Sequence, residues 1–434
     1  MHKQKGTALF LTMVAITILA IIAYALVTIS MIQSRVTAER LGESKAYYYA
    51  RVGVSKAIDE LEHDYWWGTS GVQTFQLEDG MYDIVVWAPE SNQTSPDKIW
   101  KVTSSGKYSG KTRKIEAWVK LESFAKFAYF TEVEKTGYTT IWFTDRDKLT
   151  GSAHTNGYFS IYRTPQCSER MTSHNKDDSR YNSATRIYTQ GGNTYTDPAK
   201  FYNYYSNYTY DYPIPLDGSP DFAFAGGQPD IPLPQDTTSV EEQAQHKFDT
   251  DVEITFLETG QIEVKPAGVD DITTIDTNDL TLHVNGDIII KGGTMKGSAT
   301  IGCTGDIKIQ ESILYQDKEK DILGLIAGDD IIIDTDPYTY NNIEINAIMM
   351  ALSGSFYVSS YSSGNPRGTL KIFGGLIQFS RGPVGTFSSY SGQVVTGYSK
   401  DYEYDTKLIN SPPPNYPTTG NIKILSLKDN GALQ

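Results

Sequence analysis

The sequence has few cysteines and a deficit of positive charge. Only Cys167 and Cys303 occur among 434 residues, so a disulfide-rich scaffold is excluded. Sequence spacing does not place the two within bonding distance, so it leaves open one disulfide or two separate buried thiols. With 38 basic against 52 acidic residues and a formal charge of −14, the chain is poorly suited to general attraction of nucleic acid or anionic lipid.

Catalytic motifs are also missing. The six histidines show no H-E-x-x-H spacing, and neither a G-x-S-x-G elbow nor a phosphate-binding loop occurs. Asp329, Asp330, Asp334 and Asp336 are the nearest candidate for the acidic cluster of a carbohydrate-cleaving β-helix enzyme. Asp334 and Asp336 resemble the start of a calcium loop, but no full loop follows, so solvated turn residues are the better interpretation. His154 and Asn156 lie in "GSAHTNG", where a turn held by local hydrogen bonds explains them better than a catalytic pair. We predict no enzyme activity, no cofactor and no metal site.

No proline precedes Pro89, and no charge interrupts "GTALFLTMVAITILAIIAYALVTISMIQS", Gly6 to Ser34. As a helix this run reaches roughly 43 Å at 1.5 Å per residue, long enough to span a membrane. A cleaved signal peptide has a shorter apolar region and a small-residue cleavage site, so a retained helix is favoured. Lys3 and Lys5 hold the amino terminus in the cytoplasm and place the rest outside, as a single-pass protein of the cytoplasmic membrane.

A one-sided helix continues from Arg35 to Leu61. Its apolar residues recur at helical spacing and form one stripe: Ala46, Ala50, Val54, Ala57, Ile58 and Leu61. The helix is therefore apolar all round in its first half and on one face in its second. An ordinary anchor needs only the first half, so the stripe predicts a globular head that packs on the second.

The N-terminal part resembles type IV pilins, in particular minor pilins of the PilX type and the tip pseudopilin of type II secretion. The resemblance is carried by the basic leader with Lys5-Gly6, the apolar run from Thr7 and "SKAYYYARVGVSKAIDEL". It implies that a prepilin peptidase cuts after Gly6, that Thr7 becomes the methylated first residue, and that other pilin subunits are partners. It also implies that the helix packs in a filament through Leu11 and the stripe residues Ala50, Val54, Ala57, Ile58 and Leu61.

Leu11 departs from the family pattern. Most pilins carry a glutamate at this position, the fifth after the cleavage site, and it pairs with the amino terminus of a neighbour. A buried carboxylate without a partner is costly. A tip subunit has no neighbour ahead of it, and tip subunits of the family often lack the glutamate. Leu11 therefore predicts a position at the filament tip.

The residues after the helix predict an antiparallel sheet. Residues 81–87, 99–108 and 111–121 alternate apolar and polar side chains, and Ser109-Gly110 marks a tight hairpin. The apolar face of this sheet is expected to cover the helix stripe. The predicted fold class is α+β followed by all-β: a long pilin-like helix with an antiparallel sheet, then a β-solenoid.

Internal repeats indicate the solenoid. "VNGDIIIKG", "CTGDIKIQE", "IAGDDIIID", "LSGSFYVSS" and "IFGGLIQFS" align on glycines spaced by 19, 23, 26 and 20 residues, about one coil each. The predicted turn glycines are Gly286, Gly305, Gly328, Gly354 and Gly374. The alternating residues after them are expected to stack in a shared core: Ile288, Ile290, Ile307, Ile309, Ile331, Ile333, Phe356 and Val358.

The segments "GSAHTNG" and "RGPVGTF" and the tail also resemble an uncharacterised family of PilX-headed bacterial surface proteins. The expected domains follow from these patterns. The predicted boundaries are 1–6 (leader), 7–62 (helix, with 7–34 in the membrane or filament), 63–122 (pilin-like sheet), 123–165 (first solenoid-like strands), 166–250 (Tyr/Pro-rich insertion), 251–400 (solenoid) and 401–434 (proline-containing tail). The tail's Pro412–Pro414 run is expected to be extended and to cover an edge of the solenoid.

The favoured function is a structural and interaction subunit of a type IV pilus or pseudopilus, which displays a solenoid at the tip for adhesion or assembly initiation. Its expected partners are pilin subunits, the peptidase, the membrane and host or surface polysaccharide. A receptor for DNA uptake is one alternative, although the visible basic patch contains only Lys107, Lys111, Arg113 and Lys114. A membrane-anchored carbohydrate-active β-helix enzyme is the other.

Overall fold

The structure is a computed structural model, and its chain divides into two compact units. The first unit comprises Met1–Gln93, Asp97–Leu121 and Gly420–Gln434, and the second Thr94–Pro96 and Glu122–Thr419. The structure describes residues 4–87, 99–136, 139–141, 148–157, 159, 166–169, 171–174, 214–215, 224–225, 228–388 and 393–433. Most of the Tyr/Asn-rich part of the predicted 166–250 insertion lies outside the described residues.

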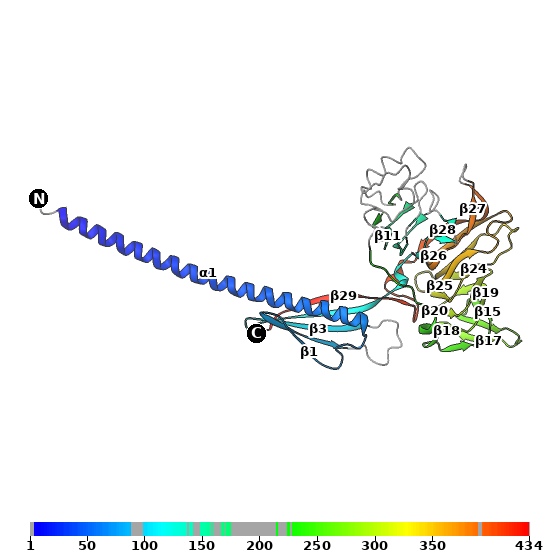
Figure 1. Ribbon diagram of the computed structural model, residues 1–434, viewed down its shortest axis with the longest axis horizontal. Coiled ribbons are helices and arrows are strands. Elements are labelled where there is room, and N and C mark those ends of the chain that lie inside the picture. Colours follow the sequence, from blue (N-terminus) through cyan, green and yellow to red (C-terminus); the bar gives the residue numbers. More distant parts are fainter. Residues whose placement is uncertain are drawn as a thin grey trace. The chain divides into compact units, whose positions relative to one another are not determined.

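Helix α1 spans Gln4–His63 without a break (Figure 1). The absence of proline allows this length. The predicted stripe faces the sheet of the first unit, and most of its residues are buried there: Ala46, Ala50, Val54, Ala57 and Leu61. Small residues bring the helix close to the sheet, because a Cβ added at Gly106 would meet backbone atoms of Ala46 and Ala50.

The sheet of the first unit has five strands in the order β1-β2-β3-β4-β29. They are β1 (Gln73–Gln76), β2 (Gly80–Trp87), β3 (Ile99–Tyr108), β4 (Lys111–Ser123) and β29 (Thr418–Leu433). The first four pair antiparallel, as the alternating pattern predicts. The fifth strand was not predicted, because residues 418–433 belonged to the expected tail. Its Asp429 lies 2.5 Å from Arg113, a residue 316 positions earlier.

The second unit stacks parallel strands in three columns. Column A contains β18 (Asn278–Val284), β20 (Ser298–Cys303), β23 (Ile322–Ala327) and the middle parts of β25 (Ile343–Val358) and β26 (Pro366–Arg381). Column B contains the start of β19 (Ile288–Met295), β21 (Ile307–Ile309), β24 (Ile331–Ile333) and the end of β25. Column C contains the end of β19, β22 (Ile313–Tyr315), the starts of β25 and β26, and β28 (Val394–Tyr404).

Column B confirms the predicted partners. Ile288 pairs with Ile307, Ile307 with Ile331, and Ile331 with Phe356, in one register from strand to strand. All four side chains lie in one buried cluster. Between the buried positions, Lys308 is partly exposed, so β21 shows the alternation of a sheet with one buried face, whereas all three residues of β24 are buried.

Column A is buried on both faces. Every residue of β23 is buried, and its sequence, "ILGLIA", is a continuous apolar run without alternation. Leu323 and Leu325 belong to the inner cluster, whereas Ile322 and Ile326 belong to a second cluster on the other face. Part of that second cluster comes from segments that run along the outside of column A, such as Ile231 and Tyr416.

Strands from the early part of the second unit pair with β26, which comes much later in the sequence. β26 pairs in parallel with β5 (Tyr129–Val133), which pairs with β9 (Ala153–Thr155), which pairs with β11 (Met171–Ser173). Column A therefore continues beyond β26 with β5, β9 and β11, although these three strands come before residue 174 in the sequence. A buried ion pair closes this junction, with Arg381 Nη1 3.1 Å from Glu134 Oε2.

Two extended segments cover the outside of column A. In the first, Ile231 exchanges backbone hydrogen bonds with the side-chain amide of Asn156, at 2.8 and 3.1 Å. In the second, Pro414 O accepts from the hydroxyl of Thr300, and Asn415 donates to Thr281 Oγ1 at 2.9 Å. Proline has no N–H to leave unsatisfied, which suits both segments. The triple proline thus lies against the stack, but it covers the outer face of column A and not the predicted edge.

Candidate functional site

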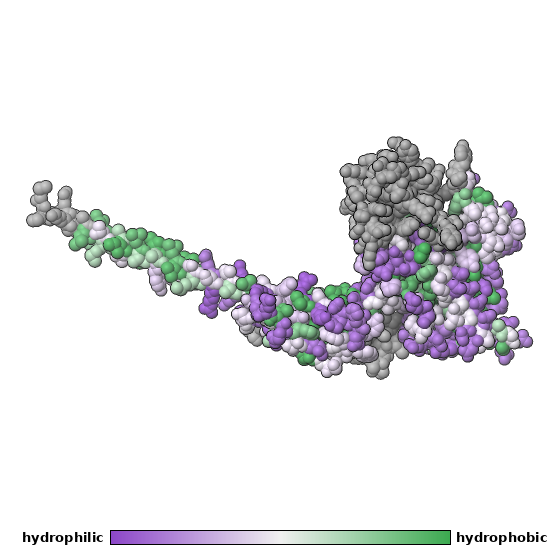
Figure 2. All heavy atoms as spheres, in the orientation of Figure 1, coloured by the Kyte–Doolittle hydropathy of each residue, from purple (hydrophilic) through white to green (hydrophobic). Residues whose placement is uncertain are grey.

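The first half of α1 is an exposed apolar surface. Figure 2 shows it as a green band that gives way to purple along the helix. Leu11 is 66% exposed, and so are large side chains all round the helix: Leu9, Phe10, Met13, Ile16, Leu19, Ile21, Leu26 and Met31. This helix is long and apolar enough to cross a membrane, with a mean hydropathy of 2.6 in its most apolar window. Water is a poor solvent for such a surface.

The structure separates the residues that the resemblance assigned to filament packing. Ala50, Val54, Ala57 and Leu61 are buried against the chain's own sheet, and Ile58 is partly buried there. Leu11 alone among the six lies on the exposed half. Gly6 and Thr7, the predicted processing site, lie in the first turns of α1, and their side chains are outside the described part of the structure.

The basic patch considered for DNA binding carries acidic partners. Lys107 lies 2.6 Å from Asp83, Arg113 lies 2.5 Å from Asp429, and Lys114 lies 3.2 Å from Glu116. The side chains of Lys101 and Lys114 hold the pKa of Glu116 down to about 2, so its carboxylate stays charged at neutral pH. Three of the four cations in this patch are therefore neutralised locally, which weakens attraction for phosphate.

The repeated Gly-Asp pairs form a ladder of carboxylates at the corner between columns A and B. Asp251 Oδ1 accepts from Asp287 N at 2.8 Å, Asp287 Oδ1 from Asp306 N at 2.9 Å, and Asp306 Oδ1 from Asp330 N at 3.1 Å. Asp330 Oδ1 accepts from Ser355 N in the next coil at 2.6 Å. Each carboxylate thus satisfies a backbone donor of the following coil, which explains why aspartate recurs.

The glycines leave room for these carboxylates. A Cβ added at Gly286 would lie 2.5 Å from Asp251 Oδ1, and Cβ atoms at Gly305 and Gly354 would meet Asp287 Oδ1 and Asp330 Oδ1. At Gly328 the obstacle is the carbonyl of Thr304 instead. These four glycines lie at one corner of the stack.

Gly374, the fifth predicted turn glycine, lies elsewhere. It is in strand β26, pairs with Ala347, and its φ is +152°. The assignment of Gly374 to the same turn is therefore wrong. The repeat alignment failed here because the glycine is required by the nearby carbonyl of Ala347, which a Cβ would meet, and not by an aspartate.

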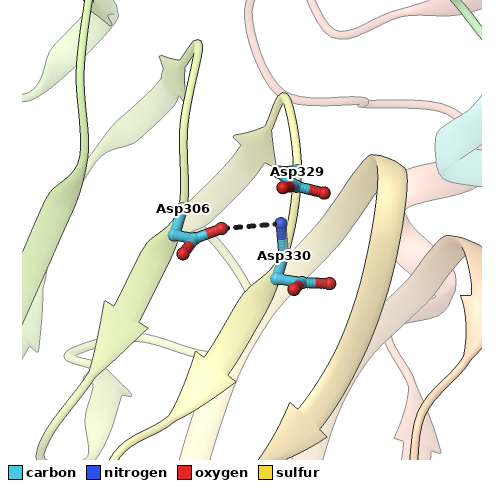
Figure 3. A group of neighbouring side chains, drawn as sticks. All are labelled: Asp306, Asp329 and Asp330. Carbon is cyan, nitrogen blue, oxygen red and sulfur yellow. Dashed lines mark hydrogen bonds between the residues drawn. The ribbon is translucent and has the colours of Figure 1, made fainter.

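Three aspartates of the ladder corner lie close together: Asp306, Asp329 and Asp330 (Figure 3). One carboxylate oxygen from each is within 4.8 Å of the others. Their oxygens already accept hydrogen bonds, from Asp330 N, Ser353 Oγ and Ser355 N respectively. Burial raises the pKa of Asp330, and the charges of Asp329 and Asp306 add to the rise. Coil-to-coil hydrogen bonding accounts for this cluster.

Cys303 is a free, buried thiol, which favours the alternative of two separate thiols, and the side chain of Cys167 lies outside the described residues. Cys303 lies in the inner cluster of column A, between Val284 and Ala327. Its Sγ donates to Gly305 O at 3.3 Å. Burial raises the pKa of this thiol well above its usual range, so it stays protonated and unreactive.

His154 lies in strand β9 and not in the predicted turn. Parallel pairing with Phe130 and Thr172 overrides the local turn propensity of His-Thr-Asn-Gly. Its ring is 2% exposed and contacts Thr172 Oγ1 at 2.8 Å and Asn156 Oδ1 at 3.1 Å. Burial lowers the pKa of His154 to about 4, so the ring is neutral at pH 7. Asn156 in turn holds the outer segment at Ile231, so both residues have structural partners.

Two tyrosines stand out on residues 334–342, between β24 and β25, here named the tyrosine loop. Tyr338 and Tyr340 are 72% and 70% exposed. Within the loop, Asp336 accepts from Tyr338 N at 2.9 Å and from Thr339 Oγ1 at 3.0 Å. The hydrogen bond from Tyr338 N lowers the pKa of Asp336, and the bond from Thr339 Oγ1 lowers it further. The Asp336 carboxylate is therefore ionised at neutral pH.

A buried arginine supports this loop from below. Arg367 is fully buried, and its guanidinium donates to Thr335 O at 3.3 Å and to Ser360 O at 2.8 Å. The Tyr398 hydroxyl contacts Thr335 Oγ1 at 2.8 Å and Asn341 Oδ1 at 3.1 Å. Both ends of the loop are therefore fixed to the stack while its middle is open. The sequence did not predict this loop. Its local signal is "DPYTYNN", and the residues that hold it, Arg367 and Tyr398, lie farther along the chain.

Comparison with known proteins finds likenesses only among solved structures. No protein-family model matches the chain, and no curated protein matches it. The crystal structure of the competence-associated pilin ComZ from Thermus thermophilus aligns with 89% of this chain and 97% of its own, at 11% identity and a TM-score of 0.26. A TM-score of 0.26 does not establish a shared fold, so functional conclusions rest on the residues of this chain.

Proposed function

We propose that this chain is a minor pilin-like subunit of a type IV pilus or related pseudopilus, with its second unit a β-solenoid displayed at the filament end for adhesion or assembly initiation. The observation that carries the proposal is one unbroken helix with two different halves. The second half packs on an antiparallel sheet of the same chain, and the first half exposes apolar residues all round.

The two halves fit a subunit that moves from membrane to filament. The exposed half is stable only in lipid or against other apolar helices. The sheet-bound half keeps the helix straight and rigidly joined to the folded part. A simple anchor requires no such continuation. The three columns of parallel strands support the solenoid assignment, since every strand added buries one more layer of the same core.

Two features favour the filament end. Leu11 provides no carboxylate to pair with the amino terminus of a subunit ahead. The second unit, Glu122–Thr419, is much larger than the sheet it follows, and repeating it along a closely packed shaft would crowd neighbours. The two features are independent, because one lies in the apolar helix and the other outside it.

Processing tests the pilin assignment. Intact-mass measurement of membrane-extracted protein should show loss of Met1–Gly6 and a chain that begins at Thr7. The control is the same protein from cells without prepilin peptidase, which should keep all six residues. A full-length chain in both strains would leave only a membrane anchor.

Labelling tests the position. Antibody against residues 280–400 should mark filament ends or the assembly base, and regular labelling along shafts would contradict the tip assignment. Leu11→Glu should not increase incorporation, because no partner is expected and a carboxylate within a membrane helix is costly, by up to about 2.5–3.5 kcal/mol at the helix centre. A gain of incorporation would place the subunit within the shaft.

A further inference from the structure

The tyrosine loop has the properties of a preorganised binding site. Arg367 donates to the backbone carbonyl of Thr335, Asp336 accepts from the backbone N–H of Tyr338, and Tyr398 donates to the side chain of Asn341. Tyr338 and Tyr340 take no part in the core, since more than two thirds of each is exposed. Tyrosine loses little conformational freedom on binding, and a fixed loop loses less still, so both rings are available at low entropic cost.

Charge around the loop narrows the ligand class. Asp334 and Asp336 precede the tyrosines in the loop and are exposed, and Asp336 is ionised at neutral pH. The supporting cation, Arg367, is buried and directed at backbone carbonyls of the stack. These carboxylates would repel a polyanion such as nucleic acid or a uronic-acid polymer. The loop itself has no exposed cation to offset this repulsion.

The size of the exposed surface on the tyrosine loop narrows the ligand class further. A stable protein interface buries about 800 Å² on each partner. Within the loop, residues 334–342, the large exposed hydrophobic side chains are Tyr338 and Tyr340. Two aromatic rings in a polar setting suit a small, flat ligand better. A sugar ring presents one face of C–H groups, which packs on an aromatic ring, and a rim of hydroxyls, which suits Asp, Asn and Thr side chains.

We propose that the tyrosine loop binds an uncharged polysaccharide, with Tyr338 and Tyr340 stacked on neighbouring sugar rings of one chain. Tyr338 and Tyr340 lie two residues apart on one exposed loop, beside a turn that the backbone hydrogen bond from Thr339 N to Asp336 O closes at 3.4 Å. Thr339, Asn342 and the two aspartates are exposed on the same loop and can meet sugar hydroxyls. This inference rests on the adhesive role proposed above and assigns its ligand class and contact residues.

Binding by the full-length protein in detergent micelles tests the site. The probes are neutral hexasaccharides of glucose, galactose, mannose and N-acetylglucosamine, with a polyuronate of equal length and single-stranded DNA as charged comparisons. We expect at least one neutral probe to bind with little dependence on salt. Tyr338→Ala and Tyr340→Ala should each weaken that binding about tenfold. Tyr338→Phe, which keeps the ring, should change it less than threefold.

Tyr48→Ala is the matched control, because Tyr48 is 63% exposed on α1 but lies outside the loop; it should bind as the unchanged protein does. Failure of every neutral probe would overturn the inference. So would binding that survives both alanine variants, or binding confined to the charged probes. Filament incorporation of the same variants is measured separately: normal incorporation without sugar binding refutes the ligand assignment alone, whereas sugar binding without incorporation refutes the filament role alone.

Discussion

The helix–sheet contact of the first unit and column B of the second unit bury apolar surface in opposite ways. In the first unit, Gly53 of α1 and Gly106 of β3 remove side-chain volume so that the helix can approach the sheet. In column B, Ile288, Ile307 and Ile331 fill the space with identical branched side chains in register. Added volume should therefore damage the first contact, and removed or charged volume the second. Hydrogen exchange resolved by peptide reports each unit separately.

The largest expected effect is a charge in column B. Ile307→Asp would bury a carboxylate between Ile288 and Ile331 with no cation beside it, at a cost of about 4 kcal/mol or more. Exchange protection should collapse across the second unit and remain in α1. Lys308→Gln, on the outer side of the same strand, loses only a partly exposed ion pair with Asp287 and should cost about 1 kcal/mol or less. Equal loss from both variants would contradict the strand register.

The second largest effect is a pH dependence confined to the second unit. The pKa of His154 falls from 6.5 to about 4 on folding, so the unfolded chain binds the extra proton between these values. The contribution is complete above pH 6.5 and is lost as pH falls toward 4, by about 3 kcal/mol in all. His154→Gln should flatten this part of the stability profile, as measured by denaturant titration. His246→Gln, at an exposed position, should leave it unchanged; a profile that stays steep in both variants would assign the effect to other groups.

A pair of glycines within one helix sharpens the comparison for the first unit. A Cβ at Gly53 would meet the Ser104 hydroxyl and come within 3.0 Å of the Tyr82 ring, so Gly53→Ala should cost about 2 kcal/mol. At Gly42 the nearest atom is Cγ of the flexible Lys111 side chain, at 3.2 Å. Gly42→Ala should therefore stabilise the helix by up to about 1 kcal/mol. Thermal unfolding that ranks the two variants in the reverse order would show that the helix does not lie this close to β3.

The smallest expected effect is at the carboxylate ladder. Asp306→Ala removes the acceptor for Asp330 N and should cost about 1 kcal/mol. Asp306→Asn keeps an oxygen in that position and removes one of three neighbouring negative charges, so it should be neutral or slightly stabilising. Calcium should not raise the melting temperature of the unchanged protein. A calcium-dependent rise that Asp306→Asn abolishes would make the corner a cation site instead.

Local patterns predicted the elements whose determinants are local. The helix stripe, the alternation in β2 to β4 and the stacked isoleucines of column B were all visible in the sequence, because each buries one face at a fixed period. Column A gave less information, since a strand buried on both faces shows no alternation. His154 was misplaced for a related reason: a turn-prone tetrapeptide became a strand through pairing with Phe130 and Thr172.

Long-range partners were not predictable. Nothing near residue 429 reveals that it will meet Arg113, and nothing near Arg381 reveals Glu134. The tyrosine loop belongs to the same class, because its exposure is visible only once Arg367 and Tyr398 are known to hold it. The wrong assignment of Gly374 shows that aligned glycines need not lie at the same corner. At Gly374 a Cβ would meet the carbonyl of Ala347 and not an aspartate.

The late arrival of β29 has a consequence for synthesis and export. The antiparallel sheet begins within the first quarter of the chain, yet its fifth strand is made last, and β5 must wait for β26 in the same manner. A chain cut short by premature termination would present two unpaired strand edges, which promote aggregation and attract proteases. Only a chain translated to its end can close both edges. The order of strands along the chain thus leaves both edges open until residues 418–433 have been made.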